Sequence, residues 1–218
     1  MVSAAPMAMN TDPGLILAQW FSPAYPVGGF AYSHGLETAI AEGVVRDRAA
    51  LQAWLEGVLA QGSGRTDAIL LAAAHRGEIA EADALARALA PSAERLRETV
   101  LQGEAFARTT AAIWGIALPP LAYPVAVGAA ARALALPVEA TARHYLQGFA
   151  GNLVSAAVRL VPLGQTEGQT CLAALAPLCA RLAAETSDGD LDETGGAAFL
   201  SDIAAMRHET LHVRLFRS

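Results

Sequence analysis

Residues 137–162, PVEATARHYLQGFAGNLVSAAVRLVP, decide the class of fold that this sequence predicts. Proline favours the start of a helix and breaks a helix interior, so Pro137 and Pro162 bracket one long helix over residues 138–160. The stretch 153–161 is apolar on nearly every face and is broken only by Arg159. A helix of that kind is either central in a bundle or buried in a subunit interface.

Helical patterns also dominate on both sides of this stretch. Runs that alternate β-branched and aromatic residues are scarce, and aromatic residues make up only 6% of the chain. Apolar spacing and end signals predict further helices over residues 15–21, 33–42, 48–61, 66–75, 79–89, 92–114, 168–185 and 199–211. Within the eighth of these nine helices in chain order, Pro177 should cause a bend or a reset.

The predicted organisation is a single all-α domain, a bundle of about eight to ten helices over residues 13–218. Residues 1–12 should form a disordered N-terminal tail. Residues 186–196, TSDGDLDETGG, are acidic and Gly-rich, which predicts an exposed, flexible loop.

The charge content limits the function. Only 17% of the 218 residues are charged and 54% are hydrophobic, which indicates an apolar surface for partners or an oligomer. The net charge of −6 argues against a general nucleic-acid binder. All 15 basic residues are Arg, so no nucleotide or Schiff-base chemistry that needs a lysine of this chain is available.

The sequence predicts a cytoplasmic protein without a membrane span. Cys171 and Cys179 lie eight residues apart on one helix, about 12 Å, too far for a disulfide. Residues 109–131 carry no charge and are long enough to span a bilayer, but three prolines interrupt them. We expect a buried helix–turn–helix there.

Residues 22–37, SPAYPVGGFAYSHGLE, are the first candidate functional segment. Two prolines and two adjacent glycines force an unusual turn, after which Ser33 can cap a helix that carries Glu37 on an early, accessible turn. The segment is either a capped loop–helix junction or a binding surface. Four aromatic residues crowd around it, which suits binding.

Two further segments have competing interpretations. Asn152, Ser155 and Arg159 share one side of the long helix, either as a polar stripe or as a satisfied core network. The sequence His208-Glu209-Thr210-Leu211-His212 matches the HExxH pattern of zinc metalloproteases. Only six residues follow it, so no downstream ligand is available and a third ligand would have to come from upstream. A structural or partner-contacting helix is the favoured interpretation, and a zinc-dependent hydrolase is the alternative.

Four segments in order resemble the UreF family of urease accessory proteins. They are SPAYPVGGFAYSHGLE from residue 22, YPVAVGAA from 123, GNLVSAAVRLVPLGQTEGQ from 151, and the ending DIAAMRHETLHVRLFRS from 202. The resemblance implies an all-α, non-catalytic, cytosolic homodimer without a stoichiometric cofactor or resident metal. It implies binding to UreD (also called UreH), recruitment of the GTPase UreG, and delivery of nickel by the complex to apo-urease.

The resemblance also suggests two sets of partner-binding residues. The UreG-facing set is Tyr25, Gly28, Gly29, Phe30, Ser33, His34 and Glu37. The UreD/UreH-facing set is Arg207, His208, Glu209, Arg214, Leu215, Phe216, Arg217 and Ser218. The C-terminal tail, residues 213–218, is expected to be disordered or held by crystal packing in the free protein and to become ordered on UreD. The alternative is that the tail packs back on its own domain. No role carries over to residues 79–89 or to most of 186–196.

Overall fold

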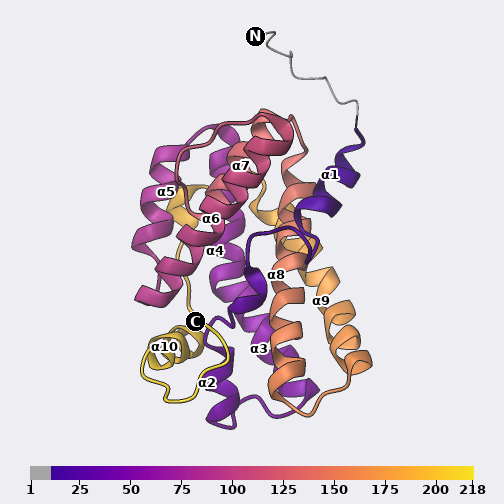
Figure 1. Ribbon diagram of the computed structural model, residues 1–218, viewed down its shortest axis with the longest axis vertical. Coiled ribbons are helices and arrows are strands. Elements are labelled where there is room, and N and C mark those ends of the chain that lie inside the picture. Colours follow the sequence, from indigo (N-terminus) through magenta and orange to yellow (C-terminus); the bar gives the residue numbers. More distant parts are fainter. Residues whose placement is uncertain (1–10) are drawn as a thin grey trace.

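A computed structural model describes residues 11–218 as a bundle of α-helices without a strand in that range (Figure 1). This confirms the predicted all-α class. The ten helices are α1 (Pro13–Trp20), α2 (Leu36–Ala41), α3 (Arg48–Gln61), α4 (Ser63–Arg76), α5 (Ile79–Ala88), α6 (Ala93–Trp114), α7 (Tyr123–Ala133), α8 (Val138–Leu160), α9 (Gln165–Thr186) and α10 (Phe199–His208). Two short 3₁₀ helices, η1 (Gly29–Ala31) and η2 (Leu191–Glu193), lie in the connections.

The core is built from closely packed, alanine-rich helices. The pairs α4–α7 and α8–α9 have the most extensive contacts, and α8 also touches α1, α2, α3, α4 and α7. At the α4–α7 crossing, a Cβ atom on Gly128 would lie only 2.2 Å from the carbonyl oxygen of Leu71. Glycine therefore allows the two helices to approach closely at this point. Of the two positions predicted for helix 138–160, central in a bundle or buried in a subunit interface, these contacts show the central one.

Local signals account for most helix boundaries. Asp47 accepts a hydrogen bond from the backbone N–H of Ala50 and caps α3, and Ser92 caps α6 through the N–H of Arg95. The helices 48–61 and 138–160 have the predicted bounds. Helix α9 runs through Pro177 as one element, so a reset of the helix there is wrong.

The helix that contains Glu37 begins later than predicted. His34 and Gly35 both have left-handed backbone conformations, with φ of 55° and 75°, so α2 starts at Leu36 rather than at Ser33. Gly35 is the N-cap residue, and a Cβ there would lie 2.5 Å from the backbone nitrogen of Ala205 in α10. The turn therefore lets α2 and α10 approach each other.

The uncharged stretch 109–131 forms the end of α6, a turn and the buried helix α7. No helix within residues 11–218 is long and apolar enough to cross a membrane. The tail expected over residues 1–12 lies outside the described residues except for its last two, and Asp12 caps α1 by accepting from the N–H of Gly14.

The acidic segment 186–196 has defined contacts with α4. Arg65 forms an ion pair with Glu193 at 3.0 Å and also donates to its carbonyl oxygen. Thr66 donates to the carbonyl of Gly195, and Arg76 donates to that of Gly189. The segment expected to be a flexible loop is thus tied at three points to a core helix.

Candidate functional site

The C-terminal tail packs against the loop that precedes α2. The backbone N–H of Arg217 donates to the carbonyl of Ala31, and the N–H of Ser33 donates to that of Ser218, both at 2.9 Å. Phe216 and Ser218 are 5% and 1% exposed. In this structure the tail therefore packs back on its own domain rather than being disordered, because the loop supplies hydrogen-bond partners for part of its backbone.

Glu37 is the principal anchor of the tail. Its two carboxylate oxygens accept hydrogen bonds from the backbone N–H groups of Leu215, at 2.7 Å, and Phe216, at 3.0 Å. Only 6% of Glu37 is exposed, so the predicted accessible carboxylate is wrong. The tail and His208 cover the face of α2 that the sequence pattern leaves open to solvent.

His208 connects Glu37 to helix α6. Its Nε2 atom lies 3.1 Å from Glu37, and its Nδ1 atom lies 2.6 Å from Glu94, while the ring is fully buried. Arg214 reaches the other oxygen of Glu94 at 2.6 Å. Both ring nitrogens of His208 thus face carboxylates of its own chain.

The HExxH motif does not form a zinc site in this arrangement. Helix α10 ends at His208, so exposed His212 does not share a helical face with it. Glu209 accepts from the N–H groups of Ala93 and Glu94 and so caps α6. Within residues 11–218 no group of three or more His, Cys, Asp or Glu side chains is placed to hold a metal ion. The zinc hydrolase is therefore not supported.

A buried charged cluster lies behind the tail, on α6. Glu98 accepts hydrogen bonds from Gln102, at 2.9 Å, and from the hydroxyl of Ser218, at 2.6 Å; it pairs with His34, at 2.7 Å, and with Arg95. Burial alone would raise the pKa of Glu98, but Arg95 and His34 lower it to about 2. Burial, reinforced by Arg95, lowers the pKa of His34 to about 4 despite Glu98.

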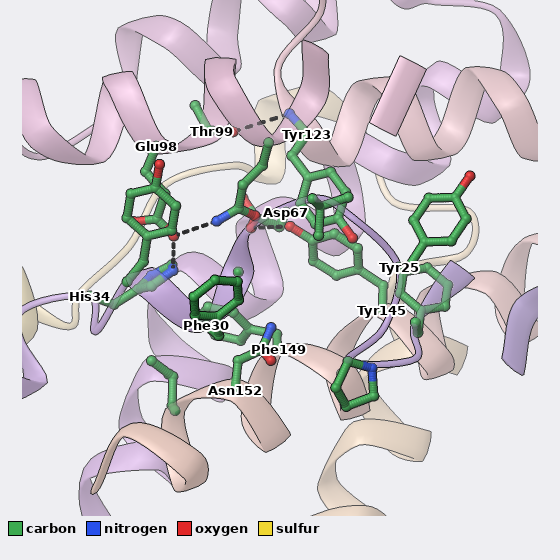
Figure 2. Close-up of a pocket in the computed structure, with 18 of the residues that line it drawn as sticks. Tyr25, Phe30, His34, Asp67, Glu98, Thr99, Tyr123, Tyr145, Phe149 and Asn152 are labelled. Carbon is green, nitrogen blue, oxygen red and sulfur yellow. Dashed lines mark hydrogen bonds and ion pairs between the residues drawn. The ribbon is translucent and has the colours of Figure 1, made fainter. Parts of the chain in front are cut away.

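A small cavity of about 70 Å³, lined by aromatic as well as polar side chains, continues from this cluster into the bundle (Figure 2). Asp67 accepts a hydrogen bond from the hydroxyl of Tyr145 at 2.7 Å, and burial raises the pKa of Asp67 to about 6. A second cavity, of about 100 Å³, shares His34, Asp67, Arg95 and Thr99 with the first. The carboxylates of Asp67 and Glu98 both accept hydrogen bonds from protein donors, which fits a fixed scaffold.

Arg159 joins the loop, the tail and α8. Its guanidinium donates to the carbonyl of Phe30 at 3.1 Å and lies 4.8 Å above the ring of Phe216. It also donates to the carbonyl of Ser155. Asn152 lies against Gly29, where a Cβ would be 2.7 Å from its amide nitrogen. The predicted polar stripe on α8 therefore faces the candidate segment.

The structure brings the two predicted partner sets together, but it exposes only one side chain of the first set and five of the second. In the first set, Phe30 is 66% exposed, the other large side chains are mostly buried, and Gly28 and Gly29 shape the turn before η1. In the second set, the exposed members are Arg207, Glu209, Arg214, Leu215 and Arg217, and the buried ones are His208, Phe216 and Ser218. Sequence reasoning missed Asp67, Glu94, Arg95 and Glu98, which contact the sets only through the tertiary fold.

The most prominent apolar surface beside the site is the outer face of α10. Phe199, Leu200, Ile203 and Met206 are between 42% and 71% exposed. Val213 and Leu215 of the tail are 82% and 71% exposed. Contiguous apolar surface of this kind marks a site of protein–protein interaction. The spacing of apolar residues at 199, 203 and 206 is a signal of this face that the sequence already contains.

A helical scaffold that holds its own tail beside exposed apolar side chains defines a protein-interaction protein. The UreF family model matches residues 45–176 of the chain. Three relatives, each named urease accessory protein UreF, come from Cereibacter sphaeroides strain KD131, Roseobacter denitrificans and Ruegeria pomeroyi. They are 62%, 54% and 49% identical over 205, 213 and 217 residues, covering 94–97% of this chain and 96–100% of the relatives. The chain belongs to the UreF family of urease accessory proteins, as the four sequence segments predict.

Proposed function

We propose that this protein acts without catalysis of its own in the maturation of urease in the cytoplasm. In this proposal it forms a homodimer, binds UreD/UreH and recruits the GTPase UreG. The resulting complex carries nickel into apo-urease, and this chain gates the GTPase. Membership of the UreF family supports the accessory role.

The observation that carries the proposal is the interlocking of the two candidate partner sets. Glu37 and Ser33 of the loop segment bind the backbone of residues 215, 216 and 218 of the tail. A partner that holds the tail therefore also stabilises the loop that presents Phe30. Such shared contacts couple the two binding events in free energy. This arrangement supports UreG recruitment that depends on UreD/UreH.

The exposed apolar side chains divide between the two partners in this proposal. UreD/UreH takes the α10 face, with Ile203 and Met206, together with Leu215 of the tail. UreG binds the surface around Phe30, which lies on the short helix η1 and whose backbone carbonyl accepts a hydrogen bond from Arg159. Aromatic and aliphatic anchors on rigid elements commonly dominate the energy of such interfaces.

Co-purification tests this division. The double variant Ile203→Glu/Met206→Glu should lose UreD/UreH and, with it, UreG and urease activation, because two charges enter an apolar interface. Phe30→Ala should keep UreD/UreH but lose UreG. The matched control Ala173→Glu/Ala176→Glu adds the same charge to an exposed face of α9 and should retain both partners. Retention of both partners by all three variants would contradict the proposal.

A further inference from the structure

A groove runs between α5 and η2, away from both candidate partner surfaces. Its α5 side is lined by Glu81, Ala84, Leu85, Ala88 and Leu89, and its other side by Leu191, Asp192 and Thr194. The groove encloses about 550 Å³. In Figure 1 the gold segment that carries η2 lies beside α5, whereas α2 and α10 lie at the lower end of the molecule.

The α5 side presents a regular helical face. Residues 81, 84, 85, 88 and 89 follow the spacing of one side of a helix, while Ala82 and Ala86 are buried on the other side. Ala84 and Ala88 are exposed and small, so they leave a trough beside the row formed by Leu85 and Leu89. From residue 81 to 89 the face is about 12 Å long, which matches about two turns of a partner helix.

The η2 side is a rigid wall. Leu191 is 7% exposed and anchors η2 in the core. The hydroxyl of Thr194 donates to the carbonyl of Leu191 at 2.6 Å, and the Arg65–Glu193 ion pair ties the end of η2 to α4. A preformed wall lowers the entropy cost of binding a segment there.

Among the described residues, the charged side chains of the groove that have no ion-pair partner are acidic. Glu81 and Asp192 form no ion pair among residues 11–218, nor do Asp188 and Asp190 next to the wall. The nearby arginines are already engaged, since Arg65, Arg76 and Arg87 pair with Glu193, Glu78 and Asp83. An occupant would therefore meet aliphatic side chains at the centre and unpaired carboxylates at the rim.

We propose that the α5–η2 groove is a docking surface for a basic amphipathic helix of a partner protein. Aliphatic residues one turn apart would fill the trough over Ala84 and Ala88. Arginine or lysine side chains would pair with Glu81 and Asp192. Helix-in-groove binding with such anchors is a recurrent mode of peptide recognition. This surface is separate from the α10 and Phe30 surfaces, so the outcome of its test does not depend on the outcome for the proposed function.

Fluorescence anisotropy with a labelled Leu/Lys amphipathic peptide of about 14 residues, four helical turns, tests the proposal directly. The full-length protein should bind this peptide saturably and more weakly at high salt. Ala84→Trp, which fills the trough, and Glu81→Arg/Asp192→Arg should each raise the Kd about tenfold or more. The controls Ala112→Trp and Glu104→Arg/Glu139→Arg make the same changes at exposed positions elsewhere and should leave the Kd unchanged.

Three results would overturn the proposal. They are the absence of saturable binding, equal binding of a peptide with Glu in place of Lys, and equal loss of affinity in the control variants. A further result assigns the groove to another occupant: if Ala84→Trp abolishes self-association in sedimentation experiments but not peptide binding, the groove is an interface between two copies of this chain.

Discussion

Glu37 holds the tail through both carboxylate oxygens, so its replacement should destabilise the protein. Glu37→Ala leaves the buried N–H of Phe216 without an acceptor and the Nε2 atom of His208 without a partner. Buried groups that lose a charged partner cost about 1–3 kcal/mol each, so urea denaturation should give a loss of about 2 kcal/mol or more. Amide hydrogen exchange at Leu215 and Phe216 should accelerate at the same time.

The control for this prediction is Glu42→Ala. Glu42 ends α2, is exposed and pairs with Arg207 at the surface, so its loss should change stability by less than about 0.5 kcal/mol. If Glu37→Ala is as stable as Glu42→Ala and the amide protons of the tail still exchange slowly, the carboxylate of Glu37 does not anchor the tail.

Asp67 should make stability depend on pH. Because burial raises its pKa from 3.8 to about 6, the folded protein binds this proton more tightly than the unfolded chain. Its stabilising contribution is therefore full below pH 3.8 and is lost as the pH rises through about 6. Asp67→Asn removes the ionisable carboxyl group and therefore removes this loss of stability at higher pH. Relative to the unaltered protein, the variant should gain about 2 kcal/mol between pH 4 and pH 7.

Urea denaturation of both proteins across this range measures the difference. His34, whose pKa is lowered to about 4, acts with the opposite sign between pH 6.5 and 4, but it is present in both proteins and cancels. A difference in unfolding free energy that does not vary with pH would refute the role of Asp67. Asn can still accept from the hydroxyl of Tyr145, which keeps the geometry comparable.

Local patterns in the sequence do not show the roles of single residues such as Glu37. The pattern around Glu37 places it on the first turn of a helix, and this part of the prediction is confirmed. Its burial depends on a tail 178 residues further along the chain, and no periodicity carries that information. The same holds for Glu98, which meets Ser218 only through the fold.

At the scale of elements, the α2–α10 contact should depend on Gly35. Alanine there must adopt a φ of 75° and place its Cβ 2.5 Å from the backbone of Ala205. Gly43 has the same φ, but a Cβ there would have no atom within 4 Å. Gly43→Ala therefore measures the backbone strain without a steric clash. Gly43→Ala should cost about 1 kcal/mol, and Gly35→Ala clearly more, with faster amide exchange across α10. Equal losses in urea denaturation would contradict the close packing.

The elements were predictable where their boundaries rest on local chemistry. Asp47, Ser92 and the prolines around 138–160 fix helix ends through side chains within a few residues. The start of α2 was not predictable in the same way, because Ser33 is a residue type that caps helices, whereas the left-handed conformations of His34 and Gly35 delay the helix to Leu36. The anchoring of η2 to α4 likewise depends on Arg65, which lies 128 residues from Glu193.

At the scale of the whole molecule, the tail should serve stability and partner binding through different residues. Phe216 is buried, so Phe216→Ala should lower the free energy of unfolding by about 3 kcal/mol. Val213 and Leu215 are 82% and 71% exposed, so Val213→Ser/Leu215→Ser should leave the melting temperature nearly unchanged. In the proposed complex the exposed pair supplies the contacts, so this double variant should still fail to capture UreD/UreH.

Deletion of residues 214–218 should then combine both effects. It removes the donors to Glu37 and Glu98 and uncovers the site behind them, so thermal melting should fall well below that of the unaltered protein. Co-purification and melting of all three variants separate the roles. If Val213→Ser/Leu215→Ser captures UreD/UreH as well as the unaltered protein does, the tail only stabilises its own fold. In that case the α10 face alone binds the partner.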